Sequence, residues 1–157
     1  MFLRYFTEIP LPYGEVGRRL LEDPGLWIPG LVHEAHERGE ALLAEVGFGG
    51  PVARLRKRVR VEIDAPARLD TKALLPMRWI PTSAGSLFPA LEGDLEIAPL
   101  GSRGCQLSVT ARYTPPLGRL GKAGDRALLH RVAEATVKDF VLRVAEALST
   151  PAPAAST

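Results

Sequence analysis

Hydrophobic and polar side chains alternate along most of the middle of the chain, which is the pattern of strands with one buried face. The alternation is clearest in Val52–Asp64, where arginines and acids occupy every second position and mostly apolar residues lie between them. Further extended stretches are Met1–Ile9, Glu40–Phe48, Arg68–Pro81, Leu91–Pro99 and Arg103–Thr114. The pattern therefore predicts an antiparallel sheet with one covered face and one face in water.

Two segments after the first strand have a different spacing. In Gly14–Asp23, apolar residues lie four or five positions apart with charged residues between them, which predicts a short amphipathic helix. Leu26–Val32 is apolar but contains a proline and a glycine. The polar His33–Glu40 that follows predicts a second short helical turn and a loop. We therefore expect two short helices after the first strand.

The longest periodic segment is Asp125–Leu148, whose apolar residues form one continuous arc at about 100° per residue. A helix of about 24 residues is about 36 Å long and can cross a small sheet. It is the one predicted element large enough to cover the apolar face of the strands. The predicted fold class is α+β: a curved antiparallel sheet of about six or seven strands that grips a long C-terminal helix.

Glycine and proline are abundant, with 15 and 14 residues, and most of them fall between the predicted elements. Because 46% of the residues are hydrophobic, the chain can bury enough apolar surface to fold, so this composition marks tight turns rather than disorder. The segment Ser149–Thr157, STPAPAAST, is small, uncharged and broken by prolines. We expect one domain over residues 1–148 and a disordered tail over residues 149–157.

The chain carries 20 basic and 18 acidic residues, a net charge of +2 that is too small to indicate nucleic acid or an anionic membrane as the main partner. The basic run Arg54–Arg60 has two interpretations. It is a surface for nucleic acid or phospholipid, or a solvated sheet face whose arginines pair with the acids of another strand. Acids with the matching alternation are Glu92, Asp94 and Glu96. No aromatic residues interleave with the arginines, which favours the solvated face.

The sequence carries no signal for a membrane or secretory location. No stretch approaches the ~20 consecutive apolar residues of a membrane helix. Arg4 and Glu8 interrupt the apolar N-terminus, which therefore lacks the core of a secretory signal. Cys105 is the single cysteine, which excludes a disulfide within the chain and fits a reducing compartment. We therefore expect a cytoplasmic protein.

The segment His33–Glu37, HEAHE, has the composition of a metal motif, but its two histidines are three residues apart. A helical zinc site of the HExxH type needs histidines at i and i+4, so that both imidazoles point the same way. The third histidine, His130, is far away in sequence. We therefore predict an exposed polar helix end here, and we expect neither a metal site nor a cofactor.

The predicted order of elements resembles the helix-grip fold of the START-like superfamily, also called SRPBCC. The segment Tyr113–Leu148, YTPPLGRLGKAGDRALLHRVAEATVKDFVLRVAEAL, resembles the last strand, loop and grip helix of bacterial members. The superfamily includes lipid-transfer domains, birch-pollen-allergen-like proteins, and polyketide cyclases and aromatases. The resemblance implies a deep, largely apolar cavity between helix and sheet. It carries over no catalytic residues, because the superfamily has no common set.

Large flexible or aromatic side chains on the inferred inward faces are the candidate walls of this cavity, although each also fits a plain core. They are Met77, Trp79, Tyr113 and Phe140.

Three polar residues are candidates to anchor a ligand in the cavity. Lys57 breaks the alternation of its strand and shares the apolar face, where it either binds a ligand acid or carbonyl or is turned outward by a bulge or the sheet rim. His130 falls within the apolar arc of the long helix, as a core histidine or a proton-transfer group. Arg126 projects to the same arc one turn earlier, either in the cavity or at its rim.

Two functions from different classes fit these residues. The first is a binding or carrier protein for a small hydrophobic molecule such as a lipid, polyketide or isoprenoid. The second is an enzyme of the polyketide cyclase or aromatase type, in which His130 or Lys57 moves protons. The sequence favours the first, because it shows no compact acid–base pair. A third interpretation is a filled core with no cavity, and neither the ligand nor the oligomeric state follows from the sequence.

Overall fold

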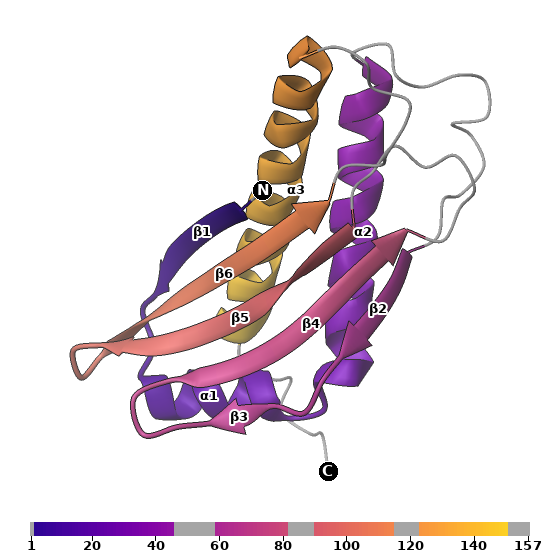
Figure 1. Ribbon diagram of the computed structural model, residues 1–157. Coiled ribbons are helices and arrows are strands. Elements are labelled where there is room, and N and C mark those ends of the chain that lie inside the picture. The colour runs from indigo at the N-terminus through magenta and orange to yellow at the C-terminus, as the bar shows by residue number, and fades with distance from the viewer. Residues whose placement is uncertain (1, 46–58, 82–89, 115–122, 151–157) are drawn as a thin grey trace.

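The computed structural model describes residues 2–45, 59–81, 90–114 and 123–150 (Figure 1). In chain order its elements are β1 (Phe2–Ile9), α1 (Tyr13–Leu21), α2 (Pro24–Glu45), β2 (Val59–Ile63), β3 (Ala67–Arg68), β4 (Ala73–Pro81), β5 (Ala90–Leu100), β6 (Gly104–Thr114) and α3 (Ala123–Ser149). The first strand, the first helix and the long C-terminal helix are therefore confirmed close to their predicted bounds.

The strands form one open antiparallel sheet in the order β1-β6-β5-β4-β2, with the short β3 paired to β4. Strands β4, β5 and β6 follow one another in chain and in space, and the N-terminal β1 completes one edge by pairing with β6. The turn between β5 and β6 contains Gly101, whose φ of +67° suits a residue without a Cβ. The predicted α+β class, with an antiparallel sheet, a long C-terminal helix and two helices after the first strand, is confirmed.

Helices α2 and α3 lie side by side on one face of the sheet, and α1 lies below them in the view (Figure 1). α3 packs against β1 and β6, and α2 packs against α3 and β2. Every second side chain of the strands points into this layer, together with one stripe of each long helix. The buried side chains of the strands include Leu3, Ile9, Leu75, Trp79, Leu95, Ile97, Leu107 and Tyr113, and those of α3 include Leu129, Ala133, Val137, Phe140, Val141, Val144 and Leu148.

The second helix is longer than predicted. We expected a short helical turn, a loop and then a strand over Glu40–Phe48, whereas α2 runs without a break from Pro24 to Glu45. Its buried positions Ile28, Val32 and Ala35 are spaced by four and three, so they form one stripe against the core. Burial of that stripe outweighs the local cost of a proline and a glycine within the helix, which alone had suggested a break.

Two predicted strands also differ in extent. Arg68–Pro81 is not one strand, because a turn closed by the bond from the Leu69 amide to the Lys72 carbonyl, 2.8 Å long, separates β3 from β4. Of Val52–Asp64, the part Val59–Ile63 is β2, and residues 52–58 lie outside the described residues. Tail residues 151–157 lie outside them as well. Within the described ranges, no helix has both the length and the apolar character needed to cross a bilayer.

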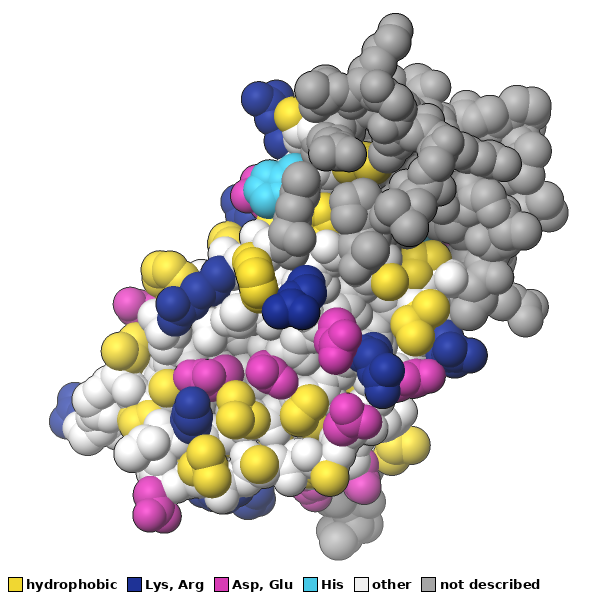
Figure 2. Space-filling view, viewed as in Figure 1, with side chains coloured by type: hydrophobic (Ala, Val, Ile, Leu, Met, Phe, Trp, Pro, Cys, Tyr) yellow, Lys and Arg dark blue, Asp and Glu magenta, His cyan; other side chains and the backbone are white. Residues whose placement is uncertain are grey.

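The outer face of the sheet carries charges of both signs, which Figure 2 shows interspersed over the strands. One row across four strands reads Glu62, Arg78, Glu92 and Arg112, so that opposite charges are neighbours at each step. Arg60 contacts Glu62 at 3.2 Å. We had expected the acids of β5 to be the neighbours of the β2 arginine, but β4 lies between these two strands. Glu92 is instead the neighbour of Arg78 and Arg112, and Asp94 and Glu96 are opposite uncharged residues on both sides.

Gly93 lies at the centre of the sheet, opposite Met77 on one side and Ala111 on the other. A Cβ at this position would lie 2.2 Å from the Thr110 carbonyl oxygen and 2.7 Å from the Ala111 Cα. Both contacts are with backbone, which cannot move away as a side-chain end can. The close approach of β5 to β6 therefore requires glycine here.

Gly93→Ala should lower the free energy of unfolding by about 1–3 kcal/mol, because the backbone of β6 must shift to admit the methyl group. The matched control is Gly30→Ala, since a Cβ at that exposed position of α2 meets no atom within 4 Å. That variant should gain up to about 1 kcal/mol from helix propensity. Urea denaturation measures both, and equal stability of the two variants would contradict this account of the sheet.

Candidate functional site

The strand register places large side chains in one row across the inner face of the sheet. Trp79 of β4 is opposite Leu91 of β5, and Leu91 is opposite Tyr113 of β6. All three side chains are buried. The row lies near the ends of β4 and β6, so it marks one end of the sheet.

Two further apolar side chains lie beside this row. Phe140 of α3 places its ring edge-on to Trp79, with 5.7 Å between the ring centroids. Met77 lies two residues before Trp79 on the same face of β4 and is also buried. The structure therefore brings the predicted residues Met77, Trp79, Tyr113 and Phe140 onto the inner face, with Trp79 and Phe140 in direct contact.

His36 joins this cluster from α2, although we had predicted an exposed helix end. Its side chain is 1% exposed, and its ring centroid lies 6.4 Å from that of Trp79. His33, one turn earlier, is exposed. The signal that could have found His36 is its position four residues after the buried Val32, because that spacing continues the apolar stripe of a helix.

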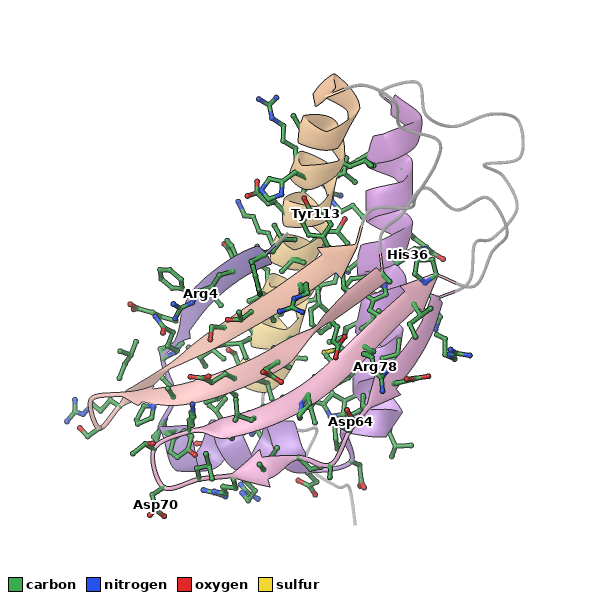
Figure 3. The ribbon with its side chains drawn as sticks, in the orientation of Figure 1. Arg4, His36, Asp64, Asp70, Arg78 and Tyr113 are labelled. Carbon is green, nitrogen blue, oxygen red and sulfur yellow. The ribbon has the colours of Figure 1, made fainter. Side chains whose placement is uncertain are left out.

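Three polar side chains lie close together where the end of β6 meets α3. The Tyr113 hydroxyl is 2.6 Å from His130 Nδ1, and His130 Nε2 is 3.0 Å from Glu134 Oε1. Figure 3 shows Tyr113 beside α3 and His36 near the ends of β2 and β4, both toward the same end of the sheet. The structure thus brings together three polar side chains that the sequence did not connect, Tyr113 and His130 being 17 positions apart and His130 and Glu134 four.

The environment of Tyr113 favours the protonated phenol. Burial, together with the nearby Glu134 carboxylate, raises the pKa of the Tyr113 phenol above its ordinary value of 10.0. The phenol therefore keeps its proton at neutral pH, and its oxygen lies within hydrogen-bond distance of His130 Nδ1.

Two of the predicted anchors are not placed by the structure. Lys57 lies outside the described residues. Arg126 lies within α3, but its side chain is not among those described. His130 is half-buried rather than fully within the apolar arc, because its ring reaches the margin of the helix where Glu134 is exposed.

Three pockets lined by described residues lie around this cluster, and Met77 and Glu134 each line one of them. One of about 330 Å³ opens on the outer face of the sheet around Gly93. Another of about 370 Å³ lies between β1 and α3, and a third of about 430 Å³ lies where α1, the start of α2 and the end of α3 meet. None of these three includes Trp79 or Phe140, whose rings pack against each other.

Metal and thiol chemistry find little support in the described part of the chain. No three histidine, cysteine, aspartate or glutamate side chains gather there in a group that could hold a metal ion. Cys105 faces inward on β6, and burial raises the pKa of its thiol. The sulfur is therefore protonated at neutral pH and is a poor nucleophile.

Comparison of the sequence with protein-family models and with curated proteins finds no match. Among solved structures, a conserved protein from Geobacillus kaustophilus matches 95% of this chain and 95% of its own, with a TM-score of 0.52 and 13% identity. The Zhui aromatase/cyclase from Streptomyces sp. R1128 matches 94% and 93%, with a TM-score of 0.47 and 12% identity. A START superfamily protein from Mycobacterium smegmatis matches 93% and 98%, with a TM-score of 0.33 and 11% identity.

All three identities are low, and only the Geobacillus kaustophilus protein among these three has a TM-score above 0.5. That likeness concerns the fold and not the chemistry. The chain therefore shares with that protein a fold in which an antiparallel sheet packs against a long C-terminal helix.

The raised pKa of Tyr113 predicts a pH dependence of stability. The phenol of the unfolded chain loses its proton near pH 10, before the folded one does. The contribution of the protonated Tyr113 phenol to the free energy of unfolding is therefore fully present below pH 10 and is lost as pH rises through the folded pKa. Urea unfolding from pH 8 upward should therefore show wild type losing stability relative to Tyr113→Phe in that window. Tyr5→Phe is the matched control for the loss of one hydroxyl, and a Tyr113→Phe profile parallel to that of wild type would refute the assignment.

Proposed function

We propose that this protein binds a small hydrophobic molecule between the sheet and α3, at the end of the sheet marked by Trp79 and Tyr113. The observation that carries the proposal is the composition of this end. Buried aromatic and apolar side chains lie beside a group of three polar side chains, Tyr113, His130 and Glu134. Ligand sites combine such walls with a few fixed polar groups.

The proposed roles follow from the chemistry of each side chain. Met77, Trp79 and Phe140 form the apolar wall, and burial of ligand surface against them contributes about 25 cal/mol per Å². The Tyr113 and His130 pair binds a ligand hydroxyl or carbonyl. Lys57 and Arg126 remain proposed anchors for an acidic or carbonyl group. The START-like resemblance supports the proposal, because it implies an apolar cavity between these same elements.

The two tryptophans allow a sharp test of the proposed position. Trp79 lies in the site, whereas Trp27 lies in α2 by the pocket at the end of α3, where its indole N–H donates to the Glu22 carbonyl. In Trp27→Phe, the remaining Trp79 should change its emission when the neutral dye N-phenyl-1-naphthylamine binds, with energy transfer to the dye. In Trp79→Phe, the remaining Trp27 should respond much less.

Three results of that titration would count against the proposal. They are no dye uptake by the wild-type chain, a response of Trp27 equal to that of Trp79, and dye affinity that is unaltered in Phe140→Ala. Circular dichroism of each variant separates a lost site from a lost fold.

A second candidate function is proton-transfer catalysis on a carbonyl ligand in the same place. The Tyr113–His130–Glu134 chain favours it, because an imidazole held between a phenol and a carboxylate can take a proton at one nitrogen and release one at the other. This is the chemistry that an enzyme of the polyketide cyclase or aromatase type needs for aldol closure and dehydration.

Two measurements, proton exchange and dye binding, distinguish the two functions. A catalyst should accelerate exchange of the α-protons of a long-chain β-keto ester in D2O, followed by NMR, and His130→Gln should lower that acceleration at least tenfold while dye binding changes less than threefold. A binding protein should take up the dye and leave the exchange rate of the ester at its solution value.

A further inference from the structure

Strand β1 forms one edge of the sheet. It pairs with β6 along all of its residues, and no other strand in the described part of the chain pairs with its second edge. Figure 1 shows β1 at the margin of the sheet, on the side of α3 and away from α2. Half of its backbone N–H and C=O groups therefore point away from β6, and such a row can pair with another strand.

The outer face of β1 carries four exposed side chains in which aromatic and charged residues alternate. Phe2 and Phe6 are 67% and 56% exposed, and Arg4 and Glu8 alternate with them. The cross-strand neighbours of the two charged residues are Thr110 and Gln106, which are uncharged. Neither Arg4 nor Glu8 has an ion-pair partner among the described residues. This differs from the row of Glu62, Arg78, Glu92 and Arg112, where each charge has an opposite neighbour.

We propose that β1 is the interface of a homodimer, in which it pairs antiparallel with β1 of a second copy so that residue 4 faces residue 8. In this register Arg4 is opposite the partner's Glu8, and Glu8 is opposite the partner's Arg4. Phe6 lies on the two-fold axis opposite the partner's Phe6. The two sheets then join into one, with both unpaired charges neutralised.

The same register also places inner-face side chains opposite inner-face side chains of the partner. Leu3 is opposite the partner's Ile9, and Tyr5 is opposite the partner's Thr7. A shift of one residue would place inner side chains opposite outer ones. A shift of two residues leaves Arg4 facing the partner's Phe6 or the partner's Pro10. A shift of four places arginine against arginine or glutamate against glutamate. The charge pattern thus selects one register and disfavours its neighbours, which also limits open-ended pairing with unrelated strands.

Charge reversal tests the interface in the full chain. Sedimentation velocity over a concentration series should show a monomer–dimer equilibrium for wild type. Arg4→Glu and Glu8→Arg should each raise the dissociation constant at least tenfold, because each places like charges opposite one another twice per dimer. The double variant Arg4→Glu, Glu8→Arg should restore the wild-type constant within about threefold, because the pairs re-form with their signs exchanged. Arg103→Glu, in the exposed β5–β6 turn, is the control for the change in net charge.

A cross-link tests the register independently. Phe6→Cys places a thiol on the axis, opposite its own copy at the Cα separation of about 4.5–5.5 Å between paired strands, which a disulfide can span. Mild oxidation should give a covalent dimer. Arg4→Cys should not cross-link, since two copies of residue 4 are four positions out of register, or about 14 Å apart. The native Cys105 is buried and is present in both variants.

Several outcomes would overturn the proposal. A wild-type chain that stays monomeric across the sedimentation-velocity concentration series contradicts the proposal directly. A dimer that is insensitive to both single reversals, or that the double variant fails to restore, assigns the interface elsewhere. Cross-linking of Arg4→Cys as efficient as that of Phe6→Cys excludes the register. Unchanged circular dichroism and melting temperature of each variant exclude unfolding as the cause.

Discussion

The structure depends on the burial of one helical stripe against one sheet face. Leu129, Ala133, Val137, Phe140 and Val144 repeat at three- and four-residue intervals along α3, and all of them are buried. An antiparallel sheet with a single apolar face is not stable in water until something covers that face. Helix α3 packs against β1 and β6, α2 beside it packs against β2, and α1 packs against β4 and β5, so the three helices together cover the face.

The candidate site is a consequence of this packing. Where α3 passes the end of β6, its side chains change from fully buried to half-buried. Polar side chains can lie at this margin because they still reach water. Thr136, inside the buried stripe, satisfies its hydroxyl by donating to the Val132 carbonyl at 2.8 Å. His130, nearer the margin, instead reaches across to Tyr113 and outward to Glu134. The polar chain thus marks the boundary between packed core and the end of the sheet.

The outer face follows a separate constraint, which is neutralisation of charge along the strand register. Alternating acids and bases occupy one row of the sheet, and the row ends at Phe2, over whose ring the Arg112 guanidinium lies at 4.9 Å from the centroid. Such pairs contribute a few tenths of a kcal/mol each, so they specify the order of the strands more than they stabilise the sheet. In the described part of the chain, no strand continues this order beyond β1, and Arg4 and Glu8 have no ion-pair partner there.

The sequence by itself determined the strand faces, the long helix and the α+β class, because those depend on a local period of hydrophobicity that survives without any tertiary contact. It failed at α2, where Pro29 and Gly30 signalled a break that the burial of a distant stripe overrides, and it failed again at His36, which the same helix carries into the core. It also identified Tyr113 and His130 singly but could not pair them. Only the tertiary structure decided that β6 ends beside the first turns of α3, because a contact between two side chains depends on how elements pack and not on the spacing within either one.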